Sequence, residues 1–132
     1  MQTTRANRFI NAVCEARYNV ARAEAAAADK RVAQWRQAGS PTQGPGALPP
    51  FLGVPCSVKE CIAVEGMANT AGLVSRCGQP ASEDATVVAR YKAAGFIVLC
   101  NTNTSELCMW YESSNKVRTQ LMCGRCAPVV PR

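Results

Sequence analysis

Two short apolar runs on either side of a helical pattern constrain the fold of this chain more than any other feature. Residues 51–58 and 96–100 are predominantly apolar and too short for a helix, which predicts two buried strands. Residues 85–94 between them carry apolar side chains at helical spacing, and Gly95 follows as a stop signal. The order strand, helix, strand is typical of a βαβ unit, so the sequence predicts an α/β fold.

The segments beside this unit carry turn and cap signals. Residues 39–50 are rich in proline and glycine, which cannot continue a helix or a central strand, so they predict a loop. Residues 61–80 mix glycine with polar side chains and predict an irregular excursion. Ser82 or Asp84 is the expected N-cap of the helix that follows.

The N-terminal part has the pattern of one long amphipathic helix over residues 5–35. Its apolar stripe consists of Ile10, Val13, Val20, Ala21, Ala25, Ala28, Val32 and Trp35. Because alanine permits close approach, the stripe favours packing against a scaffold over membrane binding. The expected organisation is a helical part at residues 1–38, a loop at 39–50, a partial domain at 51–117 and a disordered tail at 118–132.

The net charge of +6, from 15 basic and 9 acidic residues, raises the question of an anionic partner. The basic residues of the first third alternate with acidic ones, as on a solvated helix face, and no stacking aromatics lie among them, so nucleic-acid binding is not expected. No apolar run approaches the roughly 20 residues of a membrane span, and no apolar secretory core opens the chain, so no compartment is assigned.

Eight cysteines invite a disulfide or zinc interpretation. Six of them are scattered and predict reduced core thiols: Cys14, Cys56, Cys61, Cys77, Cys100 and Cys108. Cys123 and Cys126 form a C-x-x-C, but it has no second ligand pair, the chain has no histidine, and prolines follow where a redox motif opens a helix. Neither a metal nor another cofactor is expected.

Residues 53–60, with the sequence Gly-Val-Pro-Cys-Ser-Val-Lys-Glu, resemble the strand-borne lysine motif of amidase-signature enzymes. Further matching pieces follow in the family's order and at about its spacing, at Gly66 and at residues 69–72, 84–88, 94–98 and 102–107. The likeness runs from about residue 7 to residue 117, and residues 105–116 resemble the fatty-acid amide hydrolase 2 branch. The resemblance implies a partial amidase-signature fold, with a long N-terminal helix and a strand-helix-strand unit of a mixed sheet.

The resemblance also implies a Ser-Ser-Lys mechanism, in which a neutral lysine takes a proton through a bridging serine while a second serine attacks an amide carbonyl. Lys59 matches that lysine. A lysine acts as a base only when it is neutral, which desolvation promotes, and Val54, Val58 and Ile62 predict apolar surroundings. The alternative is an ordinary solvated lysine at the end of a strand.

Three apolar residues in a short helical stretch at 106–111, Cys108, Met109 and Trp110, match the part of related enzymes that lines the acyl-chain channel. The alternative for them is plain core packing. Residues 102–105 match a turn near the active site of the family, or else form a polar loop whose hydrogen bonds are satisfied locally. The implied substrate is a small acyl amide, and the family allows membrane association.

After Asn115 the family continues into a glycine and serine-rich signature that supplies both serines, and residues 118–132 do not resemble it. None of the serines beside the matching segments lies in a glycine and serine-rich sequence of this kind, namely Ser57, Ser105, Ser113 and Ser114. We therefore expect no amidase activity from this chain alone. A strand at residues 96–100 is also expected to leave an apolar edge exposed. The alternative function is a non-catalytic interaction module, whose basic N-terminal helix docks on a partner or an anionic membrane.

Overall fold

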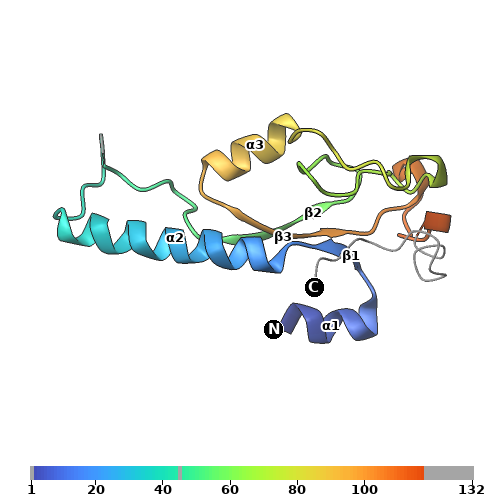
Figure 1. The fold of residues 1–132 in the computed structure, drawn as a ribbon, viewed down its shortest axis with the longest axis horizontal. Helices are drawn as coiled ribbons and strands as arrows, with labels where there is room; N and C mark the ends of the chain where they lie inside the picture. The colour runs from blue at the N-terminus through green and yellow to red at the C-terminus, as the bar shows by residue number, and fades with distance from the viewer. Residues whose placement is uncertain (1, 45, 118–132) are drawn as a thin grey trace.

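The chain folds around a three-stranded mixed sheet in a computed structural model that describes residues 2–44 and 46–117. The elements are, in order, α1 (Gln2–Ile10), β1 (Val13–Ala16), α2 (Tyr18–Gln37), β2 (Pro55–Lys59), η1 (Val74–Arg76), α3 (Thr86–Ala93), β3 (Ile97–Thr102) and η2 (Glu106–Cys108). Figure 1 shows α3 above the strands, while the long α2 runs beside the sheet and projects past it. Among the described residues, none of the helices is long and apolar enough to cross a membrane.

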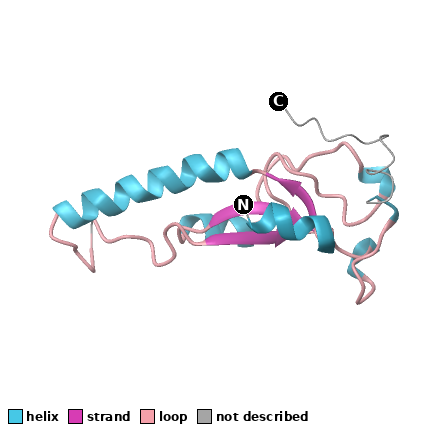
Figure 2. Ribbon diagram, turned by 90° about the horizontal axis from the view of Figure 1, so that it is seen from below, coloured by secondary structure: helices cyan, strands magenta, loops and turns pink. Residues whose placement is uncertain are grey.

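The sheet has the order β1-β3-β2, with β3 in the centre (Figure 2). β2 and β3 are parallel, and α3 connects them, so the predicted strand-helix-strand unit and its mixed sheet are confirmed. β1 is antiparallel to β3 and occupies its other edge. The prediction that residues 96–100 leave an apolar edge exposed is therefore wrong for the end of this segment, because β1 pairs with residues 100–102 and the N–H of Arg17 donates to the carbonyl of Leu99.

The prediction of one helix over residues 5–35 is wrong, because β1 interrupts it. The α1 helix ends near Asn11, whose φ is +48°, and the side-chain oxygen of Asn7 accepts the backbone N–H of Val13 at 2.8 Å. Beyond that point the backbone pairs with β3, and the N–H of Arg17 donates to the carbonyl of Leu99 at 3.0 Å. Long-range strand pairing overrides the helical period of this segment.

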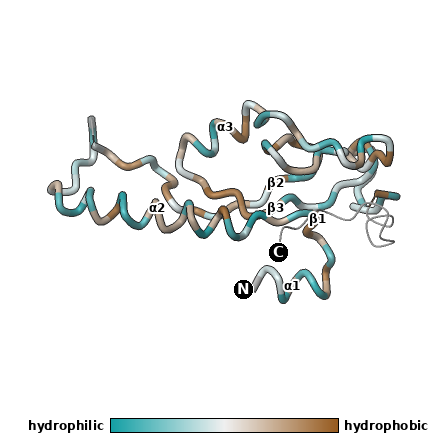
Figure 3. Tube along the Cα trace, viewed as in Figure 1, coloured by the Kyte–Doolittle hydropathy of each residue, from teal (hydrophilic) through white to brown (hydrophobic). Residues whose placement is uncertain are grey.

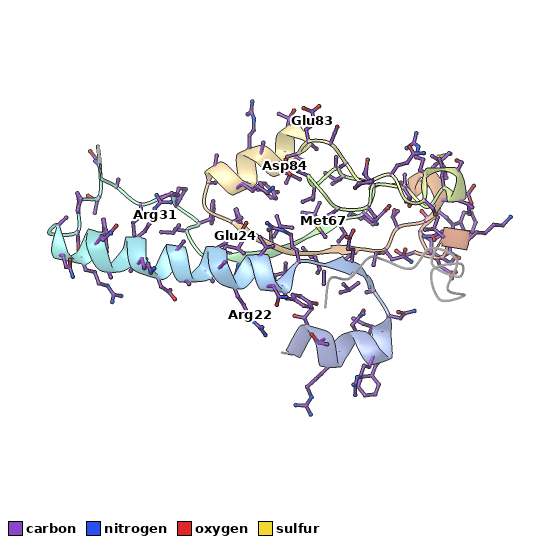
Figure 4. All side chains as sticks on the ribbon, viewed as in Figure 1. Arg22, Glu24, Arg31, Met67, Glu83 and Asp84 are labelled. Carbon is purple, nitrogen blue, oxygen red and sulfur yellow. The ribbon has the colours of Figure 1, made fainter. Side chains whose placement is uncertain are left out.

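The core lies between the sheet, α3 and the irregular segment at residues 61–80. Its buried cluster consists of Val58, Val64, Met67, Val88 and Val98. Met67 comes from the irregular segment and is labelled in Figure 4, and the most hydrophobic stretch of the trace follows the first part of β3 in Figure 3. On α2 only Ala21 and Ala28 of the predicted stripe are buried, and a Cβ built on Gly53 would meet the Ala28 Cβ at 3.7 Å, so alanine does permit a close approach there.

The boundaries of the predicted βα elements shift by a few residues. β2 begins only at Pro55, because Gly53 has a φ of +82° and residues 51–53 form a turn. The predicted caps are wrong, since Ala85 is the N-cap of α3 and no side chain caps it. The carboxylate of Asp84 instead accepts two hydrogen bonds, one from the ammonium of Lys92 at 2.6 Å and one from the backbone N–H of Glu65 at 2.9 Å. These charge-assisted bonds occupy its carboxylate.

Candidate active site

The carboxyl ends of β2 and β3 meet at one edge of the sheet, where α/β proteins place ligands. Lys59 is the last residue of β2 and pairs in register with Thr102, the last residue of β3. The pairing continues one step further, because the N–H of Glu60 donates to the carbonyl of Thr102 at 2.8 Å. The residue predicted as the proton acceptor therefore lies at this edge.

Lys59 is exposed in this chain, so the apolar surroundings predicted for it are wrong here. Alternate residues of a strand point to opposite faces, and Val58 points into the core while Ser57 and Lys59 lie on the exposed face. Val54, which is 40% exposed, does not enclose the amine either. Neighbours in sequence cannot desolvate a side chain that the strand turns to the other face.

Glu60, which sequence reasoning did not single out, anchors the loop next to this edge. Its side chain is 4% exposed, and its two carboxylate oxygens each accept one backbone N–H, from Thr70 and from Ala71. Its own backbone carbonyl accepts the side-chain amide of Asn69 at 3.0 Å. A carboxylate directly after a buried strand and ahead of a glycine-containing loop was the available signal.

The anchored loop packs against the segment that follows β3. A Cβ built on Gly72 would stand 2.8 Å from the Cα of Glu106, so only glycine fits this contact. The N–H of Leu107 donates to the carbonyl of Ala71 at 2.7 Å, and both of these residues have a positive φ, +51° and +50°. Two loops far apart in sequence thus form one surface beside Lys59.

The polar turn after β3 satisfies its own hydrogen bonds, as the alternative interpretation of residues 102–105 predicts. The buried Ser105 hydroxyl donates to the carbonyl of Trp110 at 2.9 Å and accepts the N–H of the same residue at 3.2 Å. The amide of Asn115 donates to Asn103 and to the carbonyl of Thr104. The Ser105 hydroxyl is therefore engaged in local hydrogen bonds.

The residues predicted to line an acyl-chain channel are exposed in this chain. Met109 is 79% exposed and Trp110 64%, and the ring of Trp110 lies 4.9 Å from that of Tyr111. Cys108 is exposed as well. Among the described residues these three side chains are not part of the core, and they form an apolar surface next to the loop anchored by Glu60.

The six scattered thiols are all outside disulfides, and they differ in environment. Burial raises the pKa of Cys56 and of Cys100, as expected for core thiols. The exposed Cys108 departs from the predicted core role. No group of three metal-ligating side chains occurs in the described part of the chain, and the Cys123 and Cys126 pair lies outside the described residues.

A match to a known protein family identifies the family to which this chain belongs. The sequence profile of the amidase family matches residues 1–124, a wider range than the pattern found in the sequence. The chain belongs to the amidase family. Its lysine motif at residues 53–60 therefore lies in a member of this family, and it ends with β2 at the edge of the sheet.

Individual relatives agree with this family. The chain is 46% identical over 111 residues to human fatty-acid amide hydrolase 2, covering 84% of this chain and 20% of that protein. The crystal structure of an amidase superposes with a TM-score of 0.69 at 25% identity, over 89% of this chain and 24% of the other. The peptide amidase of Stenotrophomonas maltophilia superposes with a TM-score of 0.55 at 34% identity, over 72% of this chain and 17% of the other. The chain thus spans about a fifth of the length of these relatives.

Proposed function

We propose that this chain contributes the catalytic lysine of an amide-hydrolase active site, and that Lys59 is this proton acceptor. The observation that carries the proposal is the place of Lys59, which ends β2 at the carboxyl edge of the parallel pair. The family membership and the likeness to fatty-acid amide hydrolase 2 support an acyl amide as the substrate.

In the proposed mechanism, neutral Lys59 removes a proton from a bridging serine, which in turn deprotonates the serine that attacks the amide carbonyl. Backbone amides of a glycine-rich loop stabilise the oxyanion. The 132 residues contain no glycine and serine-rich segment of this kind. Because nucleophile and base act as a unit, the chain by itself is expected to hydrolyse no amide.

The exposure of Lys59 agrees with an active site of which this chain supplies the lysine but not the serines. A lysine base needs an environment that excludes water, and the described residues leave its side chain open. The face of β2 that carries Ser57 and Lys59 is therefore the face that further polypeptide has to cover. On the same argument Cys108, Met109 and Trp110 line the acyl-chain channel once this apolar surface is covered.

A serine-reactive fluorophosphonate probe tests the proposal on the purified 132-residue chain. We expect no stoichiometric labelling, with a complete serine hydrolase as the positive control. Stoichiometric labelling that disappears in a Lys59→Ala variant but persists in a Lys30→Ala variant would show that the chain holds a nucleophile of its own.

A second candidate function rests on α1 and the start of α2. An open pocket of about 370 Å³ lies between these helices, and three arginines line it, Arg5, Arg8 and Arg22. Figure 4 shows Arg22 extending from α2 toward α1. Phe9, which is 89% exposed, gives α1 an apolar side chain next to this charge. Basic and apolar side chains on one short helix favour docking at an anionic membrane surface.

Co-sedimentation with vesicles separates the two candidates. The interaction module predicts binding to phosphatidylserine vesicles that is lost in an Arg5→Glu/Arg8→Glu variant and retained in an Arg31→Glu control. Equal binding to neutral and anionic vesicles, or none to either, leaves the amide-hydrolase proposal as the account of the chain.

A further inference from the structure

Residues 104–114 form a closed loop whose two ends meet directly beyond the end of β3. The side-chain amide of Asn103 donates to the carbonyl of Ser113, and its side-chain oxygen accepts the amide of Asn115 at 2.9 Å. The amide of Asn115 also donates to the carbonyl of Thr104. We call these side-chain hydrogen bonds the asparagine clasp. Compact loops with closely held ends are frequently functional.

The clasp ties the loop to the sheet next to Lys59. Asn103 directly follows Thr102, which pairs with Lys59 in parallel register. The N–H of Asn103 donates to the carbonyl of Ala12 at 2.8 Å, and the thiol of Cys14 in β1 donates to its side-chain oxygen at 3.5 Å. The ends of the loop are therefore fixed relative to the end of β2.

Within the loop, polar groups are hydrogen-bonded while apolar side chains are exposed. The Ser105 hydroxyl is bonded to the carbonyl and to the N–H of Trp110. The N–H of Leu107 donates to the carbonyl of Ala71 at 2.7 Å. The exposed apolar and aromatic side chains are Leu107 at 52%, Met109 at 79%, Trp110 at 64% and Tyr111 at 82%. An apolar surface that a loop holds in the open in this way indicates a contact site.

The tip of the loop has a backbone conformation that needs restraint. Leu107 and Cys108 have φ values of +51° and +59°, a region that residues other than glycine rarely adopt. Such a backbone persists only where the surrounding structure enforces it, and it is concentrated at functional positions. The asparagine clasp at the ends of the loop and the hydrogen bond to Ala71 supply this restraint.

We propose that Asn103 and Asn115 are positioning residues for the acyl chain of the amide substrate. They act through the loop, because they hold its exposed side chains at residues 107–111 at a fixed place relative to Lys59. The inference rests on the proposed function, in which Lys59 is the proton acceptor and this apolar surface lines the acyl-chain channel. An opened clasp should weaken the binding of long acyl chains, since these make the larger apolar contact.

Fluorescence anisotropy of Trp110 tests the clasp in the full 132-residue chain, in a Trp35→Phe background that leaves Trp110 as the remaining tryptophan. Asn115→Asp keeps the shape of the side chain but replaces its NH₂ donor with an oxygen, which repels the carbonyl of Thr104. We expect lower anisotropy in Asn115→Asp and in Asn115→Ala than in the native loop. Asn19→Ala, at an exposed asparagine of α2, is the matched control and should leave it unchanged. Circular dichroism checks that each variant keeps its fold, and equal anisotropy in all of them overturns the proposal.

The substrate role is tested in a hybrid in which residues 7–117 of this chain replace the matching segment of human fatty-acid amide hydrolase 2. Hydrolysis of decanamide and of butanamide is compared. With Asn115→Asp we expect the KM for decanamide to rise at least about tenfold, and the kcat for butanamide to change by less than about twofold. A merely structural role would instead lower the rates for both amides together, with the amount of folded enzyme.

The two ways to fail are distinguishable. An active hybrid in which Asn115→Asp changes both amides equally, or neither, overturns the role of the clasp and leaves Lys59 as the base. A hybrid that is inactive with the native segment contradicts the proposed function, and with it this inference, while the clasp is still intact.

Discussion

Replacing Glu60 by glutamine tests the anchor that holds the loop beside Lys59. In the native chain each carboxylate oxygen accepts one backbone N–H, from Thr70 and from Ala71. A glutamine side chain has only one oxygen, so in either orientation its NH₂ group faces one of these N–H groups. One charge-assisted hydrogen bond is lost, and a buried donor is left without an acceptor.

The expected cost follows from these two losses. A hydrogen bond to a charged group contributes about 1.5–3 kcal/mol, so Glu60→Gln should lower the free energy of unfolding by about that amount. Urea denaturation followed by circular dichroism measures the change, and hydrogen exchange should show faster exchange of the Thr70 and Ala71 amides. Glu83→Gln, at an exposed glutamate, is the control and should change the free energy by less than about 0.5 kcal/mol. Equal stability of the two variants would refute the anchoring role of Glu60.

Two further changes test the same region and the start of α3. Gly72→Ala should lower the free energy of unfolding, measured by urea denaturation, by about 1–3 kcal/mol more than Gly78→Ala does. Both glycines have a positive φ, but only a Cβ at position 72 would meet backbone atoms, those of Glu106. Equal losses of stability in the two variants would show that this contact does not require glycine. Partial burial raises the pKa of Asp84, but hydrogen bonds from Lys92 and from a backbone N–H outweigh it, and the net shift is downward. A depressed pKa gives stability that is present above the unfolded value and lost as pH falls through the folded one, so Asp84→Asn should be destabilising at pH 7 and nearly neutral well below about pH 4. Exposed Asp29→Asn should show no such trend, and a pH-independent difference for Asp84→Asn would contradict the argument.

The central unit of this fold was predictable because its signals are local. Residues 85–94 show the helical period, and Gly95, with a φ of +101°, stops the helix where expected. β1 was not predictable in the same way, because its extended backbone depends on pairing with β3 at the far end of the described chain. Its sequence has a helical period that only tertiary pairing overrides.

The candidate site was predictable in position but not in environment. The motif at residues 53–60 places Lys59 at the end of a strand, as the structure shows. Its exposure depends on which face of β2 the rest of the chain covers, and the sequence around it contains no such information. Glu60 and Gly72 act through contacts with other loops, so the local pattern marks Glu60 as a carboxylate after a strand but does not reveal the partners of either residue.

A segment exchange tests the central claim about Lys59 most directly. The matching 111-residue segment of human fatty-acid amide hydrolase 2 is replaced by that of this chain, and hydrolysis of a fatty-acid amide is measured. We predict an active hybrid whose kcat/KM falls by roughly 10³-fold or more in a Lys59→Ala variant and stays unchanged in Lys30→Ala. A hybrid that hydrolyses the amide equally well with alanine at position 59 would contradict the account.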